Sequence, residues 1–159
     1  MCELAHQFFI TDFGKLLLAA CCASIIGWER QRMEKAAGLK THVLIAFGAC
    51  LFTIVGFKYT PDSNSGELLR VFQGIVTGVG FVGAGAIIRQ GMYVRGVTTA
   101  AGIWVIAAIG MAVGAGEYLL AIYSSIIVFI MLRAFSYIEK IMPKRRYRRK
   151  AKETDVTAK

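Results

Sequence analysis

The stretch VTTAAGIWVIAAIGMAVG, from Val97 to Gly114, contains 18 residues and no charged side chain. About 20 residues of α-helix cross the hydrocarbon core of a bilayer, so this stretch predicts a transmembrane helix. The rest of the chain contains four comparable apolar segments: Phe8–Trp28, Thr41–Phe57, Leu68–Ile88 and Tyr118–Tyr137. The second of the five segments is the shortest, and we expect it to extend by a turn at one end. The sequence therefore predicts an all-α polytopic membrane bundle of about five transmembrane helices.

The composition supports a membrane protein with one domain. Of the 159 residues, 56% are hydrophobic and only 18% are charged, which is far from the average of soluble domains. Charged and turn-forming residues gather between the apolar segments. We expect a transmembrane domain over residues 1–138 and a basic tail over residues 139–159.

Lysine and arginine gather at one end of the predicted bundle. With five spans, loop 29–40, loop 89–96 and the chain from Arg133 onward share one side. They hold four, two and ten basic residues, which is 16 of the 19 in the chain. Because cytoplasmic loops carry an excess of basic residues, the sequence predicts an N-terminus outside the cell and a C-terminus in the cytoplasm.

Much of the net charge of +9 comes from the tail. Six of its basic residues stand close together: Lys144, Arg145, Arg146, Arg148, Arg149 and Lys150. Because this cluster follows a membrane span, anionic lipid headgroups are its expected partner. Nucleic acid is not expected to bind.

Cysteine and histidine do not follow a metal-binding pattern. Cys21, Cys22 and Cys50 lie inside apolar segments, where a free thiol acts as a small hydrophobic side chain. The sequence contains no C-x-x-C pair, and His6 and His42 do not have the spacing of metal ligands. It also shows no nucleophile–base pair. We therefore expect no metal, no cofactor and no enzymatic activity.

The third apolar segment is rich in glycine, with Gly74, Gly78, Gly80, Gly83 and Gly85. Residues 78–83 match the G-x-G-x-x-G pattern of dinucleotide-binding folds. They lie within a predicted span, however, and lack the following acidic residue that such a site needs. Small residues let transmembrane helices approach closely, so we interpret these glycines as helix-packing positions and expect this helix at the bundle centre. The alternative is a helix that breaks at glycine and lines a transport site.

A group of polar residues is expected near the cytoplasmic interface: Glu29, Arg30, Thr41, His42, Thr98 and Thr99. Gly96 before Thr98 predicts a helix start whose free amides suit an anion, with Arg95 beside it. We treat these six residues and Arg95 as candidate functional or interaction residues. Glu29 and Arg30 suggest an ion pair or ligand site. The alternative is that the charges anchor helix ends at the interface and threonine caps a helix.

Four blocks of the sequence resemble those of one membrane-protein family. They read GWERQ at 27–31, AGLKTH at 37–42, GVGFVGAGAI at 78–87 and RGVTTAAGIW at 95–104. Their order and intervals also agree with the family. The chain is therefore similar to the MgtC/SapB membrane domain over roughly residues 12–135.

This resemblance implies a bacterial inner-membrane protein. Members are linked to growth at low magnesium, survival inside host cells and acid tolerance, and some regulate other membrane proteins, including the F-type ATP synthase. Many carry a soluble C-terminal domain, whereas this sequence ends in the basic tail. Thr98 also stands where virulence-associated members can have asparagine. We expect a short member of the family without the soluble domain.

Two functions fit the predicted protein. A regulator would bind another inner-membrane protein through its helices. A homo-oligomer, in which the helices of two copies of the chain pack together, is also possible. A transporter of magnesium or another ion would need carboxylates or other polar groups in the membrane interior. Only Asp12, Glu29 and Glu117 fall in or beside a span, and none stands at a helix centre. The sequence therefore favours the regulator, with an ion transporter as the alternative.

Overall fold

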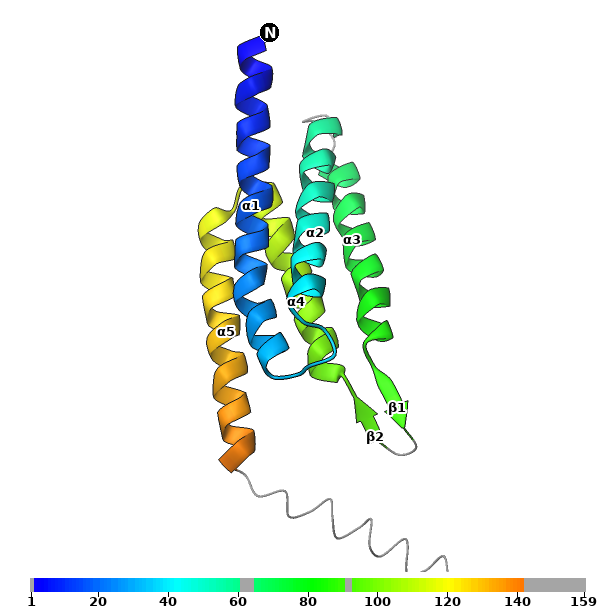
Figure 1. Cartoon of the computed structure of the whole chain (residues 1–159). Helices are drawn as coiled ribbons and strands as arrows, with labels where there is room; N and C mark the ends of the chain where they lie inside the picture. The colour runs from blue at the N-terminus through cyan, green and yellow to red at the C-terminus, as the bar shows by residue number, and fades with distance from the viewer. Residues whose placement is uncertain (1, 61–64, 91–92, 142–159) are drawn as a thin grey trace, which may run out of the picture.

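The computed structural model describes residues 2–60, 65–90 and 93–141. In chain order they form α1 (Cys2–Arg32), α2 (Leu39–Tyr59), α3 (Ser65–Gly85), β1 (Ile88–Gln90), β2 (Tyr93–Arg95), α4 (Val97–Ala115) and α5 (Tyr118–Ile141). Five helices in this part of the chain are long and apolar enough to cross a membrane. They stand side by side and alternate in direction (Figure 1). The predicted all-α polytopic membrane bundle is confirmed.

The observed boundaries differ from the predicted ones most in α1, which begins six residues before the predicted Phe8 and ends four residues after the predicted Trp28. α2 begins two residues before and ends two residues after the predicted Thr41–Phe57, so it lengthens at both ends. α3 ends at Gly85, three residues before the predicted Ile88. The chain then enters a short antiparallel hairpin of β1 and β2, in which Ile88 pairs with Arg95. A loop was expected over most of this hairpin.

Gly96 joins the hairpin to α4 in a conformation that favours glycine. Its φ is +90°, and a Cβ at this position would lie 2.0 Å from the carbonyl oxygen of Ala86. A larger side chain would therefore meet both a strained backbone and a steric clash. Gly96 thus allows the start of α4 to lie directly against the chain that leaves α3.

The central helix of the bundle is α4, which contacts the other four helices. Half of its membrane span is buried, against 11% for the spans of α3 and α5. Two glycines explain its close approach to α2. A Cβ at Gly110 would lie 2.3 Å from the carbonyl oxygen of Ala46, and one at Gly114 would lie 2.7 Å from Cβ of Thr53. Small residues here bring two backbones together, as in other membrane bundles.

The glycine-rich helix α3 lies at the edge of the bundle (Figure 1), so the expectation of a central position is wrong. The helix is continuous, which also excludes a break at its glycines. Gly83 packs against α4, with the Ala100 carbonyl oxygen 3.5 Å from its Cβ position. The other four glycines pack against no helix in the described part of the chain, where nothing lies within 4 Å of a Cβ at Gly74, Gly78, Gly80 or Gly85.

One end of the bundle, here named the basic end, consists of the α1–α2 connection (33–38), the β1–β2 hairpin and the last turn of α5 (Figure 1). These connections lie together, as the distribution of charge predicted. At the opposite end, Lys58 donates to Asp12, and Nζ of Lys15 donates to the Gly114 carbonyl over 3.2 Å. The cluster from Lys144 to Lys150 lies outside the described residues.

Candidate functional site

Glu29 and Arg30 form a buried ion pair near the end of α1. Nε of Arg30 donates to Oε2 of Glu29 over 2.5 Å, and the two residues are only 2% and 3% exposed. The connection after α1 folds back on them, since the amide of Lys35 donates to the Arg30 carbonyl over 3.1 Å. The pair therefore belongs to the interior of the basic end, and it is not an exposed interfacial anchor.

One polar atom of each side chain has no partner in the described part of the chain. These atoms, Oε1 of Glu29 and Nη2 of Arg30, are buried and make no hydrogen bond. Leaving such an atom unpaired costs free energy, and the cost is larger for a charged group than for a neutral one. A ligand that reached either atom would therefore gain a strong hydrogen bond.

His42 is fully buried at the start of α2. Its Nδ1 lies 2.8 Å from the carbonyl oxygen of Gly38. Because a carbonyl can only accept, Nδ1 carries the hydrogen, and in the neutral imidazole Nε2 is then an acceptor. Nε2 has no partner among the described residues, and it lies 3.7 Å from the Cβ position of Gly102. The imidazole therefore faces α4.

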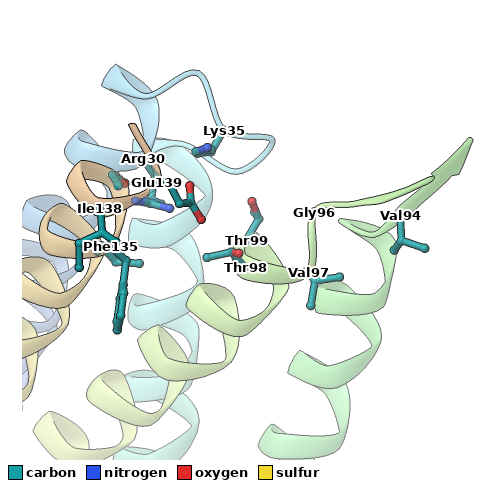
Figure 2. A pocket seen from close by; sticks show the side chains of 12 residues that line it. Arg30, Lys35, Val94, Gly96, Val97, Thr98, Thr99, Phe135, Ile138 and Glu139 are labelled. Carbon is teal, nitrogen blue, oxygen red and sulfur yellow. The ribbon is translucent and has the colours of Figure 1, made fainter. Parts of the chain in front are cut away.

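A pocket of about 450 Å³ opens at the basic end, between the end of α1, the start of α4 and the last turns of α5. Figure 2 shows the side chains that surround it. Its polar wall contains Arg30, Lys35, Thr98 and Thr99, and its apolar wall contains Leu132, Phe135 and Ile138. Glu139, on the exposed last turn of α5, also lines the pocket.

The helix α4 begins at this pocket without a side-chain cap. Gly96 precedes the helix, and no side chain of the described residues caps it by a hydrogen bond. The amide of Ala100 donates to the Gly96 carbonyl over 2.8 Å. The amides of Val97, Thr98 and Thr99 therefore have no acceptor within the helix. They form the positive end of the helix dipole.

The pocket brings together three of the seven candidate residues, Arg30, Thr98 and Thr99. Thr99 is 3% exposed, whereas Thr98 is open to the surroundings. Glu29 does not line the pocket and is connected to it through its ion pair with Arg30. His42 is buried against α4 and does not line the pocket either.

The remaining two candidates lie apart from the pocket. Thr41 is partly buried on α2, and Arg95 is exposed on β2. Neither lines the pocket. The cation that the sequence placed beside the start of α4 was Arg95. In the structure the cations that line the pocket at the start of α4 are Arg30 and Lys35, because the end of α1 and the connection after it lie against the start of α4.

The sequence did not single out Lys35, Ser136 or Glu139 as site residues. The pocket-lining residues of α5 include Leu132, Phe135, Ser136 and Glu139. Their spacing of three and four places them on one helix face, and that spacing was the available signal. Lys35 had no comparable signal, because its position depends on how the α1–α2 connection folds.

A second cavity of about 520 Å³, here named the α2–α3 groove, lies between those two helices. Its lining includes Leu44, Gly48 and Phe52 of α2 and Val71, Gly74 and Gly78 of α3. Leu44 is 70% exposed and Phe52 is 63% exposed. The groove therefore opens on the outer surface of the bundle, where lipid or another helix would lie.

The described ranges contain no group of three His, Cys, Asp or Glu side chains that could hold a metal ion. Cys21, Cys22 and Cys50 are free thiols. The residues that line the pocket at the basic end instead offer cations and N–H donors.

Several known proteins are similar to this chain over most of its length. The sequence profile of the MgtC family matches residues 16–141. The putative magnesium transporter YhiD of Escherichia coli K12 is 46% identical over 127 residues, which cover 76% of this chain and 59% of that protein. Protein MgtC of Salmonella typhimurium is 42% identical over 121 residues, which cover 74% of this chain and 51% of that protein.

Protein SrpB of Synechococcus elongatus is 36% identical over 138 residues, which cover 80% of this chain and 76% of that protein. The chain thus spans between half and three fifths of the first two relatives and three quarters of the third. No solved structure gives a significant match. Because the family profile covers most of a chain that also has five membrane-spanning helices, this protein belongs to the MgtC family of multi-pass membrane proteins.

Proposed function

We propose that this chain is a regulatory protein of the bacterial inner membrane, which receives a helix of another membrane protein in its α2–α3 groove. The observation that carries the proposal is the empty face of α3. Gly74 and Gly78 line the groove, and none of the described residues comes within 4 Å of a Cβ at either position.

The bundle itself shows what this glycine spacing does in the protein. Gly110 and Gly114 of α4 are also four residues apart, and they receive α2 at backbone-to-backbone distance. Gly74 and Gly78 present the same spacing to the outside. Transmembrane helices associate by such close packing, since lipid tails are as apolar as the side chains. A transmembrane helix is therefore the expected occupant of the groove.

Transport of magnesium or another ion is the second candidate. One relative is named a putative magnesium transporter, and the buried, unpartnered Oε1 of Glu29 is the feature that favours this function here. A conduction path, however, needs polar groups along the membrane interior. Among the described residues, four of the six buried polar ones lie at the basic end: Glu29, Arg30, His42 and Thr99.

The other two buried polar residues, Thr53 and Ser125, use their hydroxyl hydrogens within their own helices. They donate to the carbonyls of Ala49 and Ala121, each over 2.8 Å. The described interior therefore supports a packed bundle with polar chemistry at one end. This distribution favours the regulator.

A photo-crosslinking residue at Phe52, which lines the groove on α2, tests the proposed docking in intact cells. We expect it to trap one specific membrane protein, and we expect the same residue at Phe13, which is exposed and does not line the groove, to trap none. For substitution by leucine, Gly14 is the matched control of Gly78, because among the described residues nothing lies within 4 Å of its Cβ position and it does not line the groove.

The substitution Gly78→Leu then links the contact to function. It should leave the chain folded, abolish the crosslinked product and abolish support of growth at low magnesium, whereas Gly14→Leu should preserve all three. Retention of growth and partner by Gly78→Leu would contradict the proposal. Magnesium flux into liposomes that contain only the purified chain would establish the transporter instead.

A further inference from the structure

The pocket at the basic end has the chemistry of an anion site that the proposed regulatory role does not use. Arg30 is 2% exposed and lines the pocket, and its Nη2 has no partner among the described residues. Nε is already engaged by Glu29. The guanidinium is therefore fixed in position by one hydrogen bond and keeps another donor for a ligand.

The start of α4 supplies donors from a second element. Because Gly96 has no side chain to cap the helix, the amides of Val97, Thr98 and Thr99 stay available at the pocket. Oriented amides and the helix dipole together favour an anion at such a position. The side chains of Thr98 and Thr99 stand at the start of α4 in Figure 2, and their hydroxyls add further donors to the pocket.

The side chains around the pocket give it an excess of donors. Arg30 and Lys35 are cations, and Glu139 is the one carboxylate among the lining residues. Glu139 lines the same pocket as Arg30, so its carboxylate would compete with an incoming anion. It belongs to an exposed turn of α5, so it can be displaced or substituted without disturbing the core.

The size of the pocket and its apolar wall suggest more than a bare ion. A volume of about 450 Å³ is in the range of small-molecule sites. Leu132, Phe135 and Ile138 provide an apolar surface opposite the donors. This arrangement suits a phosphate group attached to a less polar body.

We propose that this pocket binds the phosphate group of an anionic ligand, held by Arg30, Lys35 and the free amides at the start of α4. The phosphate belongs either to the headgroup of a phospholipid or to a soluble phosphate ester. The site is independent of the α2–α3 groove, so either proposal can fail without the other.

The two sources are separated by binding measurements on the purified full chain. In nanodiscs of phosphatidylcholine, calorimetric titration with glycerol phosphate measures the soluble source. In mixed lipid, native mass spectrometry measures retention of phosphatidylglycerol relative to phosphatidylcholine. Binding in either arm supports the site and identifies the source. Absence of binding in both arms overturns the proposal.

Three exposed substitutions assign any binding to the pocket. Lys35→Gln should weaken it roughly 2- to 5-fold, as expected for one partly solvated charge. Glu139→Gln should strengthen it, because a competing carboxylate is removed. Lys40→Gln should leave it unchanged, since Lys40 is exposed nearby on α2 but does not line the pocket. Equal effects of the two lysine substitutions, or weaker binding by Glu139→Gln, would overturn the assignment.

Discussion

Nε of Arg30 lies 2.5 Å from Oε2 of Glu29, and neither residue is more than 3% exposed. This contact connects the end of α1 to the polar wall of the pocket, because Arg30 belongs to both. Nη2 of Arg30 has no hydrogen-bond partner among the described residues, so it is available to a ligand in the pocket. The stability of the basic end and the chemistry of the pocket therefore depend on the same side chain.

Glu29→Gln should destabilise the protein. The substitution leaves the Arg30 charge buried without its counterion, and breaking a buried pair costs about 3–5 kcal/mol. We expect a lower melting temperature in detergent and a lower free energy of unfolding by steric trapping. Arg32→Gln, at an exposed position two residues beyond Arg30, is the control and should have little effect.

A double substitution tests whether Glu29 and Arg30 act as a pair. Glu29→Gln combined with Arg30→Gln should lose about 1–3 kcal/mol less stability than the sum of the single losses. Strictly additive losses would show that the two side chains contribute independently.

Alanine should have opposite effects at two glycines of the bundle. At Gly110 the new methyl group would lie 2.3 Å from the Ala46 carbonyl oxygen, and overpacking of this kind costs about 1–3 kcal/mol. At Gly80 it would meet none of the described residues within 4 Å, and alanine favours a helix interior over glycine by about 0.5–1 kcal/mol. Melting temperatures of the two variants in the same detergent check this. A similar fall in melting temperature for Gly110→Ala and Gly80→Ala would contradict the packing described for α3 and α4.

Gly96→Ala should cost more stability than Gly116→Ala. Both glycines have left-handed backbones, with φ of +90° and +92°, and that strain costs alanine about 1–2 kcal/mol. Only at Gly96 would Cβ also approach a backbone oxygen, Ala86 O at 2.0 Å. Gly116 therefore controls for the strain alone. Equal melting temperatures would mean that the hairpin moves aside at no cost.

Labelling of introduced cysteines in intact cells tests the orientation. The probes are Tyr59→Cys and Glu34→Cys, at exposed positions on opposite ends of the bundle, in a chain whose four native cysteines are replaced by alanine. Because the basic end is expected in the cytoplasm, an impermeant maleimide should modify the residue at 59 and spare the one at 34. The reverse pattern would invert the topology.

The tail is expected to bind anionic membranes by charge. Seven basic residues lie between Lys144 and Lys152, and each contributes about 1 kcal/mol near an anionic leaflet. A peptide of residues 139–159 should bind vesicles that contain phosphatidylglycerol and dissociate in 1 M salt, where the Debye length falls to about 3 Å. A peptide with these seven residues replaced by glutamine is the control. Binding that persists at high salt would exclude an electrostatic mechanism.

The candidate site was partly visible in the sequence. The uncharged start at Val97 after Gly96 marked a helix N-terminus with free amides, and the adjacent Glu29 and Arg30 marked an ion pair. Both features depend on neighbours in sequence, and the structure contains both. The cation at the helix start was assigned to Arg95 because it is adjacent in sequence. Arg30 and Lys35 occupy that place through a contact between distant segments.

The sequence by itself determined that five helices cross a membrane and that their basic connections share one end. Apolar length and charge decide these features locally. Each spanning segment must be apolar and must pair its own backbone hydrogen bonds in the bilayer, whichever segment it packs against. Only the tertiary structure decided that α4 is central and that α3 lies at the edge. Glycine permits close approach in both helices, but the partner depends on how two whole surfaces match. Gly110 and Gly114 meet α2 within the chain, whereas Gly74 and Gly78 face outward.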